Sequence, residues 1–166
     1  MEEGFPSGYE AIRWAVQRVN TPIIDGPNIW LLGRKTAPRD MMPTLNQWEK
    51  LAEAALILKI VERSCNLKQK VVLMSYFSGG SSDETMALAQ YIGSELNRDR
   101  WFVRDSIIGW GRGSPPHSSE WWGKKYGVNL RTIQRWSMGV RRSLDDIFSS
   151  ALSNAEDALK ESGHVA

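Results

Sequence analysis

The segment from residue 119 to residue 138 constrains the fold more than any other stretch, because it predicts two short helices joined by a tight turn. Such a pair needs a small residue where the helices cross and a glycine in the turn, and Gly123 and Gly127 meet those needs. Asn129 is a strong N-cap residue for a second helix beginning at Leu130. The inward positions hold only apolar or aromatic residues: Trp122, Tyr126, Val128, Ile133 and Trp136.

This pattern resembles the helix-turn-helix of DNA-binding regulators, in which the second helix recognises DNA and begins just after the Gly-Val-Asn turn. Gly123 departs from the alanine usual in that family and costs some helix stability. The residue types expected to face outward bond to phosphates and base edges. The expected DNA-binding residues are Lys124, Lys125, Asn129, Arg131, Thr132, Gln134, Arg135, Arg141 and Arg142. The alternative is a helix pair that only packs in a core.

Charge is distributed unevenly along the chain. Residues 1–97 carry 10 basic and 11 acidic side chains, residues 98–142 carry 10 and 3, and residues 143–166 carry 1 and 5. The basic third contains the predicted helix-turn-helix, as expected of a surface that meets phosphates. A merely solvated charged face would not require the charges to gather around one motif.

A second resemblance covers residues 66–93. This segment begins with an N-cap pair, Asn66 and Gln69, and continues as an aliphatic helix that ends in Tyr-Phe. A glycine turn follows, and then a Ser-x-x-Glu start opens another helix. This layout resembles the opening of sigma factor region four and of the Q-type late antiterminators of lambdoid phages. In those families the glycine turn leads directly into the recognition helix-turn-helix, whereas here residues 94–118 intervene. Either a sigma-like motif carries an extra helix and loop, or two helical pairs lie side by side and only the second binds DNA.

Helical periodicity predicts an all-α fold of six or seven helices with a helix-turn-helix and a long C-terminal helix. Residues 1–43 are expected to form an N-terminal helix (9–19) and a Pro/Gly-rich arm, and residues 44–166 a helical DNA-binding domain. Thr44 and Gln47 suggest a capping box for a central core helix ending near residue 64. The residues expected to be largely buried are Trp48, Leu56, Val72, Ala89, Trp122, Ile133, Trp136 and Leu144.

The last predicted helix runs from Leu130 to about Glu161, with a basic start and an acidic end. Its basic first half is expected to lie on nucleic acid. Its second half has two open interpretations, packing within the chain or a homodimer contact.

Composition argues against several function classes. One cysteine (Cys65) and two histidines (His117 and His164) cannot form a Cys/His zinc cluster, so we expect no metal and no cofactor. His164 is expected in a fraying tail, and no catalytic constellation emerges, so we expect a protein that is not an enzyme. The acidic start and the lack of a long apolar run argue against secretion and membrane insertion, which predicts a reduced, cytoplasmic setting.

The expected function is therefore a sequence-specific transcription regulator that binds double-stranded DNA. The two resemblances imply phage-type antitermination or a sigma-like role with RNA polymerase. The alternatives are a DNA packaging protein of the phage small-terminase kind, which also uses a helix-turn-helix but assembles as a ring, and a helical adaptor whose basic surface meets an acidic protein.

Overall fold

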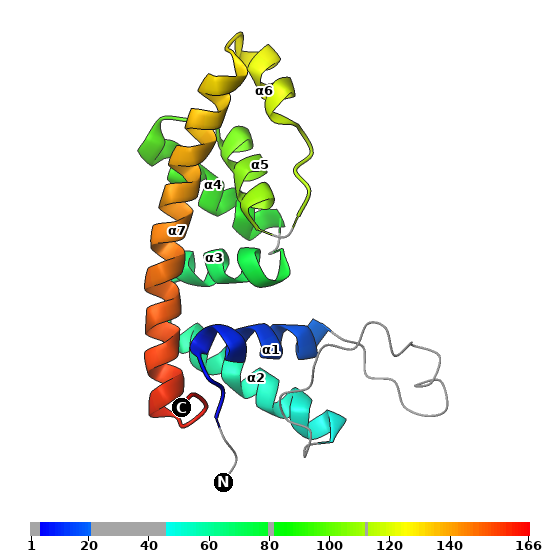
Figure 1. The fold of residues 1–166 in the computed structure, drawn as a ribbon, viewed down its shortest axis with the longest axis vertical. Coiled ribbons are helices and arrows are strands. Elements are labelled where there is room, and N and C mark those ends of the chain that lie inside the picture. The colour runs from blue at the N-terminus through cyan, green and yellow to red at the C-terminus, as the bar shows by residue number, and fades with distance from the viewer. Residues whose placement is uncertain (1–3, 21–45, 80–81, 112) are drawn as a thin grey trace, which may run out of the picture. The chain divides into compact units, whose positions relative to one another are not determined.

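The computed structural model describes residues 4–20, 46–79, 82–111 and 113–166. Over these residues the chain is all-helical, and the predicted fold class and long C-terminal helix are confirmed (Figure 1). The helices of the described ranges are α1 (Gly8–Asn20), α2 (Gln47–Ser64), α3 (Leu67–Ser78), α4 (Ser82–Leu96), α5 (Arg100–Trp110), α6 (Ser119–Tyr126) and α7 (Leu130–Glu161).

Two compact units share the chain. The terminal unit consists of residues 1–64 and 153–166, and the central unit consists of residues 65–152. The helix α7 contributes its first part to the central unit and its last part to the terminal unit. The domain boundary expected after residue 43 lies outside the described residues, as does the Pro/Gly-rich arm that precedes it.

In the terminal unit, both ends of the described chain are held. The Phe5 amide donates to the His164 carbonyl over 2.8 Å, and the Ala166 amide donates to the Phe5 carbonyl over 3.0 Å. The His164 ring also lies 2.8 Å from a Glu53 carboxylate oxygen of α2. The expectation that His164 lies in a fraying tail is therefore wrong, because its backbone and its side chain both have partners.

The helix α2 begins at Gln47, and reciprocal capping bonds join Asn46 and Glu49 over 3.0 and 2.9 Å. The expected capping box of Thr44 with Gln47 involves Thr44, which lies outside the described residues. The structure buries only one stripe of α2, formed by Ala54, Ile57 and Val61. Trp48 and Leu56 lie off that stripe and are 60% and 46% exposed, so the prediction of a central core helix is wrong.

The central unit has its own core, to which all five of its helices contribute. The buried cluster contains Val71, Val72, Leu88, Ala89, Ile92, Phe102, Val103, Ile107, Trp122, Ile133, Val140 and Leu144. The predicted burial of Val72, Ala89, Trp122, Ile133 and Leu144 is thus confirmed, while Trp136 is half-buried.

Two predicted helices of this unit agree closely with the structure. Asn66 and Gln69 form the expected capping box of α3. The helix α5 lies within residues 94–118, where an extra helix was one of the two possibilities, and it packs against α4. Residues 94–118, which separate the segments 66–93 and 119–138, therefore contribute a helix to this core.

None of the helices in the described ranges is long and apolar enough to cross a membrane.

Candidate nucleic-acid interface

The turn between α6 and α7 has the geometry that the sequence predicts. Gly127 adopts φ 65°, in the left-handed region where a side chain is strained, and it ends α6 after eight residues. The Val128 amide then donates to the Gly123 carbonyl over 3.0 Å. These contacts turn the chain sharply between the two helices.

Gly123 is the small residue at the crossing. It is buried, and a Cβ atom added to it would lie 3.1 Å from the Val128 carbonyl oxygen. That distance is shorter than ordinary van der Waals contact. The glycine therefore allows a closer approach than the alanine usual in the resembling family, which offsets part of its cost in helix stability.

Asn129 caps α7, as predicted. Its side-chain oxygen accepts from the Thr132 amide over 2.8 Å and from the Thr132 hydroxyl over 2.9 Å. These bonds use the Asn129 side-chain oxygen and the Thr132 hydroxyl, and they fix the start of α7.

A buried carboxylate holds α6 against α5. Asp105 is 3% exposed, and its Oδ2 accepts from the Trp122 indole over 3.0 Å and lies 3.0 Å from His117 Nδ1. Its Oδ1 accepts from the Arg104 guanidinium over 2.9 Å. Three donors satisfy this carboxylate, as a buried charge requires.

A second tether joins the same two helices. The Tyr126 hydroxyl of α6 donates to Asp99 over 2.6 Å, and Asp99 is the N-cap residue of α5. Burial and this hydrogen bond, in that order, raise the pKa of Tyr126 above its ordinary value, so the phenol keeps its proton. Reaching Asp99 places Tyr126 at the surface, 37% exposed, which corrects its predicted inward position.

Aromatic contacts complete the packing of the pair. The Trp122 ring lies edge-on to Phe102 with centroids 5.5 Å apart and stacks with Tyr126 at 5.7 Å. Trp136 of α7 meets Tyr126 edge-on at 5.7 Å, and the Arg98 guanidinium lies 4.3 Å from the Trp136 centroid. The start of α7 is therefore positioned by α5 and α6 together.

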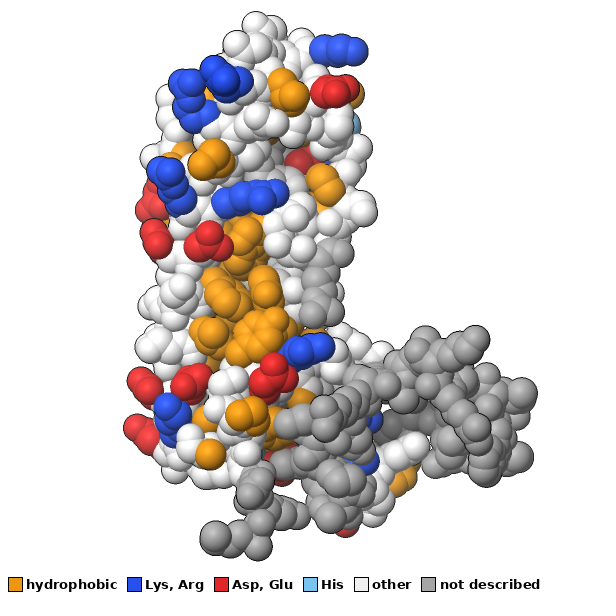
Figure 2. All heavy atoms as spheres, in the orientation of Figure 1, with side chains coloured by type: hydrophobic (Ala, Val, Ile, Leu, Met, Phe, Trp, Pro, Cys, Tyr) orange, Lys and Arg blue, Asp and Glu red, His pale blue; other side chains and the backbone are white. Residues whose placement is uncertain are grey.

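The outward face of α7 carries the predicted basic and amide side chains. Arg131, Gln134, Arg135, Met138 and Arg142 recur at the spacing of one helical face and are all exposed. Figure 2 shows lysine and arginine side chains at the end of the central unit where α6 meets α7. Within the described ranges, no hydrogen bond or ion pair engages Lys124, Arg131, Gln134, Arg135, Arg141 or Arg142.

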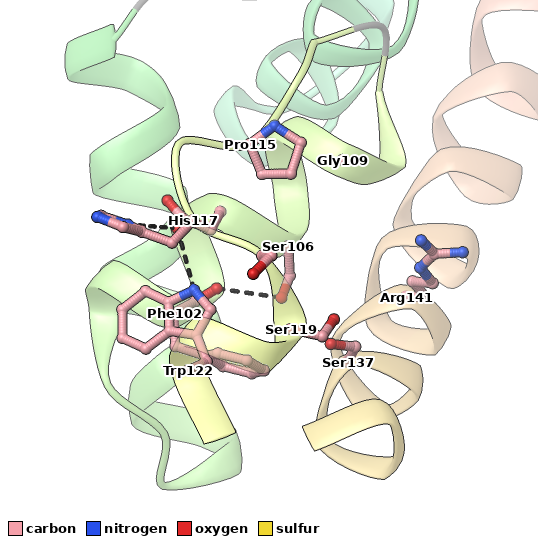
Figure 3. A pocket seen from close by; sticks show the side chains of 11 residues that line it. Phe102, Ser106, Gly109, Pro115, His117, Ser119, Trp122, Ser137 and Arg141 are labelled. Atoms are coloured by element: carbon pink, nitrogen blue, oxygen red, sulfur yellow. Dashed lines mark hydrogen bonds and ion pairs between the residues drawn. The ribbon is translucent and has the colours of Figure 1, made fainter. Parts of the chain in front are cut away.

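A pocket of about 110 Å³ lies beside this face. Figure 3 shows its polar lining, in which Ser137 and Arg141 come from α7, Ser119 from α6 and Ser106 from α5. His117 lines it too, from the loop that precedes α6. Among the described residues, no three His, Cys, Asp or Glu side chains gather as a metal site.

No protein-family model, curated protein or solved structure matches this chain.

Sequence reasoning missed Asp105 and His117. Asp105 stands among Phe102, Val103 and Ile107 on the inward side of a predicted helix, and that position was its only signal. His117 lies in a Pro/Ser loop, where nothing in the sequence indicates the carboxylate across from it.

Proposed function

We propose that this protein is a sequence-specific regulator of transcription that binds double-stranded DNA, with the first turns of α7 in the major groove. One observation carries the proposal. A tight two-helix turn presents a row of basic and amide side chains on one face of α7, and those side chains have no partner in the described chain. Arginine bonds to guanine, and glutamine to adenine, through paired hydrogen bonds at the major-groove edge.

The residues divide into two roles. Arg131 and Gln134 lie in the first turns of α7, where a recognition helix contacts base edges, and Arg135 extends the same face. Lys124 belongs to α6, the helix that crosses the DNA backbone in this motif. Arg141 and Arg142 lie farther along α7 and supply further charge for phosphates.

The link to transcription rests on the resemblance of residues 66–93 to sigma factor region four and to phage late antiterminators. We accordingly propose RNA polymerase as a partner and the cytoplasm as the setting. The capped start of α3 and its left-handed end at Gly79 support the helical layout behind that resemblance. A homodimer would give a two-fold symmetric target, as in many regulators of this type.

The decisive experiment is a selection of bound sites from random duplex DNA, followed by titration of the selected and a scrambled duplex at several salt concentrations. Six cations are expected to contact the duplex: Lys124, Lys125, Arg131, Arg135, Arg141 and Arg142. Their release of counterions should weaken binding by a factor on the order of 10³ between low and moderate salt. Lys59→Ala removes an exposed charge from α2 and should leave the slope unchanged.

The alternatives give different results in the same samples. A shallow salt slope without a preferred site would favour the protein adaptor. A ring-sized particle by light scattering would favour the packaging protein over the regulator.

A further inference from the structure

Two tryptophans of the central unit are unusually exposed. Trp101 of α5 and Trp121 of α6 are 42% and 41% exposed. An indole is among the largest apolar groups in a protein, and leaving it in water forfeits much of its burial energy. Their exposure therefore needs an explanation beyond the packing of this unit.

A continuous line of contacts joins these two indoles. The Arg104 guanidinium lies 5.0 Å from the Trp101 centroid and is bonded to Asp105 over 2.9 Å. On the other side of Asp105, His117 lies 3.0 Å away and stacks on Trp121 with ring centroids 3.7 Å apart. We call the surface formed by Trp101, Arg104, His117, Trp121 and Lys125 the aromatic strip.

Positive charge accompanies both ends of the aromatic strip. The Arg100 guanidinium lies 5.4 Å from the Trp101 centroid, and the Lys125 ammonium lies 5.2 Å from that of Trp121. The one acidic group in the line, Asp105, is buried and paired with Arg104. What this surface offers to solvent is thus two exposed indoles, each beside an exposed cation, Arg100 or Lys125.

We propose that the aromatic strip binds single-stranded nucleic acid, with bases stacked against the indoles and phosphates neutralised by the cations. Alternating aromatic and basic groups suit this ligand because every unpaired base has a face to stack and every nucleotide has a charge. Paired bases in a duplex keep their faces covered, so the two indoles form a second site, which shares only Lys125 with the proposed duplex contacts. It does not depend on duplex binding by α7.

The test measures fluorescence anisotropy of labelled 20-nucleotide DNA and RNA of mixed sequence. Trp101→Leu and Trp121→Leu should each weaken single-strand binding about tenfold, the scale of one lost base stack. Trp101→Phe and Trp121→Phe retain an aromatic face and should recover most of that loss. Trp48→Leu changes an exposed tryptophan of α2 and should have no effect.

Parallel titrations separate this site from the proposed duplex site. Both leucine variants should bind a duplex within about twofold of the unchanged protein, the usual range for surface substitutions. Gln134→Ala should leave single-strand affinity unchanged. The proposal is overturned if the unchanged protein binds neither DNA nor RNA single strands at low salt, or if the leucine variants bind them as well as the unchanged protein does. If the protein binds an acidic peptide and neither DNA nor RNA single strands, the proposal is overturned as well.

Discussion

Single residues decide how α6 meets α7. Gly127 supplies a backbone angle that other residues adopt only under strain, and Gly123 leaves room for the Val128 carbonyl. Asn129 then fixes the first turn of α7 through its bonds to Thr132. All three roles were predictable, because they depend on neighbours within a few positions in the sequence.

The first prediction separates sequence recognition from anchoring. Arg131→Ala or Gln134→Ala should cost about 1 to 3 kcal/mol on the selected duplex and relax its sequence preference, since each removes bonds to base edges. Lys124→Ala should weaken binding to selected and scrambled duplexes alike. None of these changes should unfold the protein, because the three side chains are exposed.

Competition binding with both duplexes measures these effects. Equal losses on the selected and scrambled duplexes for Arg131→Ala and Gln134→Ala would show that α7 does not occupy the groove as proposed.

At the scale of helices, the least predictable feature is what holds α6, a helix of only eight residues, in place. Isolated helices this short are unstable in water, so tertiary contacts must supply most of its stability. They come from Asp105 and Asp99, which belong to α5 or cap it. Those contacts join residues 17 and 27 positions apart, so local sequence patterns did not reveal them.

We expect Asp105→Ala to destabilise the central unit by about 3 kcal/mol, because it leaves the Trp122 indole and the Arg104 guanidinium without their buried acceptor. Asp145→Ala is a matched control, because Asp145 also accepts from an indole, that of Trp110 over 2.9 Å, but is exposed. It should cost less than about 1 kcal/mol. Urea unfolding followed by circular dichroism measures both, and equal losses would contradict the positioning role of Asp105.

The failed prediction for α2 has a related cause. Its apolar residues are spread around the helix, so periodicity indicates a core helix without saying which stripe has a neighbour. The structure gives it a stripe of three buried residues, Ala54, Ile57 and Val61. Local propensity identified the helix, but the choice of buried side depended on the rest of the unit.

At the scale of the whole molecule, Glu156, near the end of α7, caps the start of α1. The Gly8 amide donates to Glu156 over 3.0 Å, and Lys160 lies 3.1 Å from the same carboxylate. The bond from Gly8, followed by that from Lys160, lowers the pKa of Glu156 below its ordinary value. A glutamate at the start of a helix also interacts favourably with its dipole.

The pH dependence of stability follows from the direction of that shift. A carboxyl group whose pKa is lower in the folded state stabilises the fold fully above its unfolded pKa of about 4.3, and the stabilisation is lost as pH falls through the folded value. The free energy of unfolding should therefore decline as the pH falls below that unfolded value, and Glu156→Gln should flatten part of that decline. Asp157→Asn, on the exposed side of the same helix, is the control. Identical pH profiles for Glu156→Gln and the unchanged protein would refute this role.

The division of the chain also has a consequence for its synthesis on the ribosome. Residues 65–152 include every segment of the central unit, whereas the terminal unit needs residues 153–166 to join its first 64. Protein domains generally fold as units while the chain emerges, the earlier one first. We expect the reverse order here, because α1 and α2 are translated first but their unit also needs residues 153–166, including the Glu156 that caps α1 and the His164 that pairs with Phe5. A chain that ends at residue 152 would keep every segment of the central unit, whereas its α1 and α2 would lack the residues 153–166 that complete the terminal unit.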